Sequence, residues 1–376
     1  MLNKIIKLSK KFIKIPSVSP YDLGCQKIIF KRLKKIGFTI ENININKTNN
    51  LLAFKGKGKT LIFLGHTDVV PVGNIKKWKT NPFNPIIIND FLFGRGISDM
   101  KGSLAAMIVA TESYIQENPF HKGRISFLIT SDEESSGNDG TVKVVKILKK
   151  RKEMINYCLV GEPTSNTVLG DVIKNGRRGS LNVNLIIYGK QGHIAYPNLA
   201  ENPIHKILNF VHQLVNFKWD KGNNYFQPSV LQISYISSGI KNITNVIPDF
   251  LKINFNIRYN TEINKKIIIF QVKKFLLKYN LKYKIKWVHS AKPFITKSGK
   301  LLKVVKKSIY KYNSFFPVLS TSGGTSDGRF FSDMNTEIIE LGLVNKTIHK
   351  VNECVKIKDL LSLSIIYKNI LKNIFI

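Results

Sequence analysis

Histidine and acidic residues recur directly behind the apolar runs of this sequence. In a parallel α/β sheet, ligands bind outside the carboxyl ends of the strands, so residues in these places converge on one edge. Each of them alone is equally well explained as a helix cap or a solvated loop residue. Together, their oxygen and nitrogen donors predict a catalytic metal site without thiolates, which suits zinc and also fits cobalt or manganese. The residues are His66 and Asp68 after LIFLG, Glu133 and Glu134 after RISFLIT, Glu162 after YCLVG, and His349 beyond the last apolar strand.

Short motifs suggest how this set divides into roles. His66 and Asp68 project to the same face of an extended chain, so the Asp68 carboxylate is expected to accept the second imidazole N–H. Asp99 lies between glycines in GRGISDMKG, and its two oxygens are able to bridge two cations, although it also suits a cap of the following helix. Glu133 and Glu134 are neighbours that point in opposite directions in strand geometry. One is therefore able to bind metal while the other acts as a general base, and a solvated acidic loop is the alternative.

The elements that must position these residues alternate between strand and helix. Up to about residue 175, apolar strand-like runs alternate with helical patterns at 103–118 and 141–156, which predicts an α/β layer with a mixed, largely parallel sheet. The middle of the chain then follows the order β-α-β-β-α-β, the split arrangement of a ferredoxin-like α+β unit. Afterwards the α/β pattern resumes, with a helix at 299–312, a strand at 336–344 and a C-terminal helix from Ile357. The sequence thus predicts a catalytic domain, 1–179 and 292–376, interrupted by an inserted domain, 180–291.

The composition is strongly basic, with a net charge of +35 from 59 Lys and Arg against 24 Asp and Glu. Because cations neutralise phosphates, this charge raises nucleic-acid binding as a second class of function. Only eight of the basic residues are arginine and the lysines are spread along the whole chain, so we expect no nucleic-acid partner. No apolar run approaches the ~20 residues of a membrane span, so we expect no membrane partner. Three scattered cysteines and the lack of a signal-peptide pattern predict a cytoplasmic protein.

The sequence resembles the family of dizinc aminoacylase and carboxypeptidase metallopeptidases. The resemblance covers essentially the whole chain and rests on GHTDVVP, GRGISDMKG, TSDEE, GEPT, QGHIAYP and a C-terminal histidine, in this order. It implies a zinc-peptidase-like catalytic domain that holds two Zn²⁺ per subunit, with Co²⁺ possible in one site. It further implies that His66 and Glu162 bind one zinc, that Glu134 and His349 bind the other, and that Asp99 bridges them.

The same resemblance implies an amide-hydrolysing mechanism and an assembly. A metal-bound water attacks the amide carbonyl, and Glu133 acts as the general base. Asp68 orients the neighbouring histidine ligand. The inserted domain is a lid that forms a homodimer, and His193 in QGHIAYP reaches across this dimer to stabilise the oxyanion.

The resemblance also implies which segments bind the substrate, because they are similar to the corresponding segments of family members that cleave N-succinyl-diaminopimelate. This substrate carries three carboxylates, so its pocket needs fixed cations and anion-binding N–H groups. Retention of arginine there, while lysine dominates elsewhere, supports bidentate carboxylate binding. Each arginine alone would equally suit a surface ion pair. A deacetylase of the same fold, such as one acting on acetylornithine, is the alternative. The expected substrate-binding residues are Arg178 in NGRRGS, Asn245 in NVIPDF, Arg258 in FNIRYN, and Thr325 and Ser326 in STSGGTSDGRF.

Overall fold

The computed structural model describes residues 1–135 and 137–376, which form two compact units. The main unit consists of Met1–Gly176, Ile295–Ser320 and Ser326–Ile376. The inserted unit consists of Arg177–Phe294 and Thr321–Thr325. The short segment Thr321–Thr325, which the sequence analysis places in the catalytic domain, thus packs with the inserted unit.

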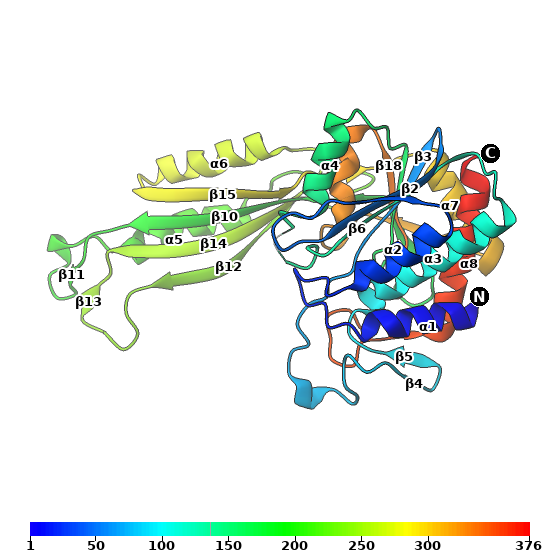
Figure 1. The fold of residues 1–376 in the computed structure, drawn as a ribbon. Helices are drawn as coiled ribbons and strands as arrows, with labels where there is room; N and C mark the ends of the chain where they lie inside the picture. Colours follow the sequence, from blue (N-terminus) through cyan, green and yellow to red (C-terminus); the bar gives the residue numbers. More distant parts are fainter. Residues whose placement is uncertain (136) are drawn as a thin grey trace. The chain divides into compact units, whose positions relative to one another are not determined.

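The main unit is built on an eight-stranded mixed sheet (Figure 1). Its central strand β3 (Thr60–His66) lies parallel to both neighbours, and all seven of its residues are buried. A strand buried on both faces is expected to be a continuous apolar run without alternation, as LIFLG is. In sheet order the strands are β1 (Thr39–Asn42), β2 (Asn50–Lys57), β6 (Gly123–Thr130), β3, β7 (Tyr157–Val160), β18 (Glu337–Glu340), β8 (Val172–Lys174) and β17 (Val318–Ser320).

Helices cover this sheet, and the most apolar of them lies deepest. Helix α3 (Gly102–Glu117) packs against β3 and also against α8 (Ile357–Ile374), which lies beside it in Figure 1. Its burial on most faces explains why its sequence is apolar nearly all round. The other helices of the main unit are α1 (Leu2–Ile13), α2 (Cys25–Lys35), α4 (Thr141–Lys150) and α7 (Lys300–Asn313). Shorter elements are β4 (Ile86–Ile88), β5 (Phe91–Phe93), β9 (Gly176–Arg177), β16 (Phe294–Ile295), β19 (Cys354–Lys356), η1 (Ile75–Lys77), η2 (Ile97–Lys101) and η4 (Asp327–Met334).

The inserted unit is an antiparallel sheet with two helices. Its strands follow the order β12-β14-β10-β15, and the chain order of strands and helices is the predicted β-α-β-β-α-β. Alternate residues of β10 and β14 are buried, so one face of the sheet makes the core. The elements are β10 (Gly179–Tyr188), β11 (Gly192–His193), η3 (Pro197–Leu199), α5 (Pro203–Asn216), β12 (Val230–Ser238), β13 (Val246–Ile247), β14 (Phe250–Tyr259), α6 (Lys265–Lys278) and β15 (Tyr283–Ala291).

Two predicted elements are shorter than their sequence patterns. The helix expected over 141–156 ends at Lys150, because Lys152 adopts a positive φ of 56° and the Glu153 N–H turns back to Leu148 O. The strand expected over 336–344 ends at Glu340. In neither case does hydrophobic periodicity register the turn. In the part of the chain that the structure describes, no helix has the length and apolar character needed to cross a membrane.

Candidate metal centre

Three parallel strands deliver histidine and carboxylate side chains to one edge of the main sheet. β3 ends at His66, which is opposite Thr130 at the end of β6. The neighbouring β7 ends at Val160, just before Glu162. Because these strands run in the same direction, the residues that follow them emerge together, and Glu133 and Glu134 follow β6 at the same edge.

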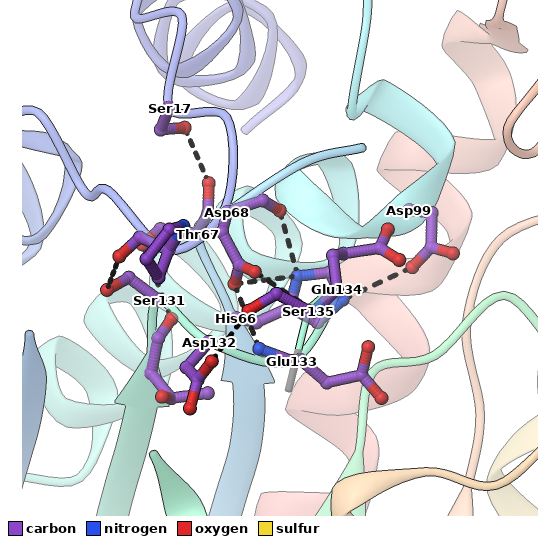
Figure 2. A network of polar contacts seen from close by, with 12 residues as sticks. Ser17, His66, Thr67, Asp68, Asp99, Ser131, Asp132, Glu133, Glu134 and Ser135 are labelled. Atoms are coloured by element: carbon purple, nitrogen blue, oxygen red, sulfur yellow. Dashed lines mark hydrogen bonds and ion pairs between the residues drawn. The ribbon is translucent and has the colours of Figure 1, made fainter. Parts of the chain in front are cut away.

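The side chain of His66 is buried, with 1% of it exposed. Its Nε2 lies 3.3 Å from Asp99 Oδ1 and 3.7 Å from Glu162 Oε1. Figure 2 shows His66 and Asp99 facing each other. One ring nitrogen of His66 is therefore surrounded by carboxylates that come from two separate segments of the chain.

The second ring nitrogen of His66, Nδ1, does not make the hydrogen bond with the Asp68 carboxylate that the sequence predicts. This nitrogen lies 3.0 Å from the backbone oxygen of Asp68, whereas the Asp68 carboxylate is 3.6 Å away, beyond hydrogen-bond distance. The carboxylate instead accepts the backbone N–H groups of Glu133 and Glu134, at 3.4 and 3.0 Å (Figure 2). The expected carboxylate hydrogen bond to the ring is thus wrong in this structure. Asp68 orients the histidine through its main chain and fixes the acidic turn through its side chain.

His349 completes a second group of donors around Asp99. Its Nε2 lies 3.3 Å from Asp99 Oδ2 and 3.0 Å from Glu134 Oε1. The backbone of His349 has a φ of 57°, a left-handed conformation that is uncommon for a residue other than glycine. The two oxygens of Asp99 therefore face two different histidines, one on each side.

The electrostatics of the site favour a bound cation. Burial, reinforced by neighbouring carboxylates, raises the pKa of Glu133 and of Glu162 well above the usual value. Burial opposes ionisation of Asp99, yet the close polar contacts with His349 and His66 hold the pKa of this carboxyl well below its usual range. Several acidic groups gathered in a low-dielectric place are costly without a compensating positive charge. A divalent cation held by these residues would supply that charge.

The donors also fit a metal pair by their positions. Two sets of possible ligand atoms are present, and within each set all atoms lie within 4.8 Å of one another. The first set comes from His66, Glu133 and Glu162, and the second from His66, Asp99 and Glu134. In addition, His66 Nε2 and Asp99 Oδ1 are buried, and among the described residues neither atom has a well-aligned hydrogen bond; such atoms are rare unless something else satisfies them. Glu133 belongs to one of these sets, so its position permits either a ligand or a base.

The inserted unit carries the other predicted catalytic residue, His193. This histidine is exposed on the two-stranded ribbon of β11 and β13. The Ala195 backbone N–H donates to His193 Nδ1 at 3.1 Å. A neutral ring held in this way carries its proton on Nε2, which is left as an exposed hydrogen-bond donor.

The two predicted substrate-binding arginines, Arg178 and Arg258, lie close together in the inserted unit. Arg258, on β14, is paired in the ladder with Ser180. Burial and the charge of Arg178 both lower the pKa of Arg258. Among the residues described, neither guanidinium forms a salt bridge with a carboxylate, and Arg178 Nε is buried without a partner. Two adjacent cations in this condition favour an anionic ligand.

The remaining predicted substrate contacts occupy varied environments. Asn245 is exposed, and its backbone oxygen accepts the Ile194 N–H at 3.1 Å. Thr325 is half-buried. Ser326 is 1% exposed, and its hydroxyl donates to the buried carboxylate of Glu340. The Ser326 hydroxyl is therefore already engaged within the main unit.

Glu353, which contacts the backbone of the Asp99 segment, is not among the residues that the sequence motifs indicate. It lies in the same stretch as His349, and its side chain is 1% exposed. The only signal in the sequence is an acidic residue four positions after a predicted ligand. Without the fold, such a residue cannot be distinguished from a surface glutamate.

The fold and this sheet edge define the class of the protein as a metal-dependent amidohydrolase. The family model described as Peptidase family M20/M25/M40 matches residues 62–373, and the chain belongs to this family. It is 56% identical to a succinyl-diaminopimelate desuccinylase of Buchnera aphidicola subsp. Acyrthosiphon pisum (strain APS), over 374 residues and 100% of both chains.

Solved structures share the fold over nearly the whole chain. An M20 family metallo-carboxypeptidase from Sulfolobus solfataricus superposes with a TM-score of 0.83 at 19% identity, covering 99% of each chain. A Bacillus subtilis protein described as a dinuclear metal binding peptidase of the M20 family has a TM-score of 0.73 at 14% identity, covering 100% of this chain and 98% of that one. At these identities the likeness establishes the fold alone.

Proposed function

We propose that this chain hydrolyses the amide bond of N-succinyl-LL-2,6-diaminopimelate, giving succinate and LL-2,6-diaminopimelate for lysine and diaminopimelate biosynthesis. The observation that carries a two-metal mechanism is Asp99, whose two oxygens each lie 3.3 Å from a different histidine. The full-length relative named as a desuccinylase supports the substrate.

Two cations per chain would be held by the residues around Asp99. His66 and Glu162 would hold one, His349 and Glu134 the other, and Asp99 would bridge them. We propose zinc in both sites, with cobalt as a substitute in one, because nitrogen and carboxylate donors without thiolate suit these ions. When bound, such a pair polarises the substrate carbonyl and makes water a stronger acid at neutral pH.

Glu133 would move the proton. Its carboxylate accepts a proton from the attacking water and then delivers it to the nitrogen of the leaving amine, so the two steps balance. An oxygen of Glu133 lies within 4.8 Å of ligand atoms of His66 and Glu162, which supports a role in proton transfer beside the cations. Asp68 supports this role because its carboxylate accepts the Glu133 N–H.

The inserted unit would contribute an oxyanion donor and an anion-binding pair. We propose that the chain forms a homodimer through this unit and that His193 Nε2–H of one protomer donates to the oxyanion formed in the other. Arg178 and Arg258 would bind substrate carboxylates, with Asn245, Thr325 and backbone N–H groups near Ser326 as further contacts. A biosynthetic enzyme of this kind is proposed to work in the cytoplasm.

The test compares the hydrolysis of two substrates by the purified protein after its metal content has been measured. Purified chain reconstituted with zinc is expected to hydrolyse N-succinyl-LL-diaminopimelate with a higher kcat/KM than N-acetylornithine. A preference for the acetyl substrate would make the chain a deacetylase of the same family. Salt-dependent nucleic-acid binding with no hydrolysis of either amide would favour the second class of function considered above.

A further inference from the structure

A buried ion pair lies beneath the Asp99 segment. Arg95 Nη1 lies 2.9 Å from Glu353 Oε2, and the two side chains are 2% and 1% exposed. Arg95 lies at the start of the segment that ends in Asp99, and Glu353 lies four residues after His349. The pair therefore connects two of the segments that carry proposed metal ligands.

Glu353 uses both carboxylate oxygens to hold the backbone around Asp99. Its Oε1 accepts the N–H groups of Ser98 and Asp99, at 2.8 and 3.2 Å. Its Oε2 accepts the N–H of Gly96 at 2.8 Å, in addition to the Arg95 guanidinium. Buried N–H groups need acceptors, and this one carboxylate supplies them for three residues of the turn.

The turn needs such an external support because its own helical bonds are incomplete. The element η2 (Ile97–Lys101) contains non-helical backbone at Asp99, with φ −124° and ψ 95°. The chain enters it through Gly96 in a left-handed conformation, φ 81°. The N–H groups in the first turn of any helical element have no partner within the element, and here the Glu353 carboxylate accepts those of Gly96, Ser98 and Asp99.

Arg95 adds contacts to the segment of His349 and to the segment that follows His66. Its Nη1 donates to Lys350 O at 3.2 Å, next to His349. Its Nη2 donates to Pro71 O at 3.3 Å, in the segment that follows Asp68. The guanidinium also lies over the Trp78 ring, 5.1 Å from its centroid. One ion pair thus ties together the segments of His66, Asp99 and His349.

We propose that Glu353, neutralised by Arg95, is a positioning residue that sets the backbone of Asp99 so that its two oxygens face the two cation sites. Glu353 does not touch the reacting atoms in this role. The inference rests on the metal centre of the proposed function. It predicts that the carboxylate of Glu353 controls how tightly the metal pair is bound.

The experiment compares zinc binding by the wild-type chain and by Glu353→Gln. Calorimetric titration of each metal-free chain is expected to show at least one zinc site weakened by about 10- to 100-fold in Glu353→Gln, the usual cost of removing a group that orients a ligand. Excess zinc should restore part of the kcat, and KM should stay within about twofold, because Glu353 contacts no substrate. A general loss of structure would not produce zinc-dependent recovery.

Glu153→Gln is the control, because it removes a carboxylate from a different ion pair, which is partly buried and joins Glu153 to Arg124 at 2.9 Å, at the start of β6 and away from its carboxyl end. It should bind two zinc ions with wild-type affinity. Wild-type affinities in a folded Glu353→Gln chain would overturn the inference while leaving the proposed function intact. A wild-type chain that binds no metal would instead overturn the proposed function.

Arg95→Lys provides a second route if Glu353→Gln does not fold. This change keeps a positive charge beside Glu353 but loses the planar fork that reaches Lys350 O and Pro71 O. We expect weaker zinc binding here as well. If Arg95→Lys binds zinc normally, or if neither variant folds, the pair serves the fold as a whole and the inference is wrong.

Discussion

The two units of the chain carry their candidate functional residues in opposite ways. In the main unit the histidines and carboxylates are mostly buried and are held by backbone hydrogen bonds, as Asp68 and Glu353 illustrate. In the inserted unit His193 is exposed, and Arg178 and Arg258 have no carboxylate partner among the residues described. The main unit therefore presents a preorganised acidic site for cations, whereas the inserted unit presents donors and cations for an anion.

This difference has a physical origin in where charge is tolerated. Adjacent buried carboxylates are stable only if a cation compensates them, so the main unit must be rigid and metal-loaded to function. An exposed donor such as His193 costs little in the free protein, so the inserted unit is able to keep it ready for substrate. The comparison predicts that changes in the main unit act on metal content and kcat, and that changes in the inserted unit act on oxyanion stabilisation and KM.

Metal removal is the change with the largest expected effect. Dialysis against a chelator should abolish hydrolysis, because the proposed mechanism needs the cations to polarise the substrate carbonyl and to acidify the water, and added zinc, cobalt or manganese should restore it. The measurement is metal content alongside turnover. Full turnover by a metal-free chain would remove the basis for contrasting the two units.

Replacement of the proposed base is expected to rank next. Glu133→Gln should keep both metals and lower kcat by about 10²- to 10⁴-fold, the range that general acid–base catalysis supplies. Glu134→Gln, at the neighbouring position, should instead lose metal. Elemental analysis and kcat distinguish the two variants. Equal metal loss in both would mean that Glu133 is a ligand, a role its distance from His66 and Glu162 allows.

In the inserted unit, His193→Ala is expected to lower kcat by about 10²- to 10³-fold without changing metal content, as removal of one oxyanion donor does. His205→Ala, another exposed histidine of the same unit, is the control and should have wild-type kcat.

Subunit mixing tests whether His193 acts across the dimer. Combining His193→Ala with Glu133→Gln should restore roughly a quarter of wild-type turnover, because random pairing in a twofold dimer gives half mixed dimers with one complete site each. No recovery, or a fully active wild-type monomer, would place His193 in its own subunit's site.

The smallest expected effect concerns the arginine pair. Arg258→Met should raise KM by about tenfold or more and change kcat less, since a hydrogen bond to a charged group contributes roughly 1.5–3 kcal/mol. Lys252→Met removes an exposed positive charge from the same strand and should leave KM unchanged. Equal effects of the two variants would indicate general attraction of an anion by the basic surface and no specific carboxylate contact.

Much of this architecture is readable from the sequence because local patterns determine it. LIFLG and RISFLIT are continuous apolar runs, and the structure has them as β3 and β6, buried as parallel strands require. The change to alternating strands after residue 180 likewise marks the ferredoxin-like unit. The ends of α4 and β18 were misplaced, because a left-handed turn at Lys152 and the exit of the chain after Glu340 leave no mark on hydrophobic periodicity.

The sequence determines which residues meet at the candidate site. The ends of parallel strands share one edge of the sheet, so the residues that follow those strands must approach one another there, namely His66, Glu133, Glu134 and Glu162. The tertiary structure alone decided how they are held. It assigned the Asp68 carboxylate to two backbone N–H groups, and it brought Glu353 from the end of the chain to the Asp99 turn. Contacts between residues more than 250 positions apart depend on packing of the whole core, which no local pattern records.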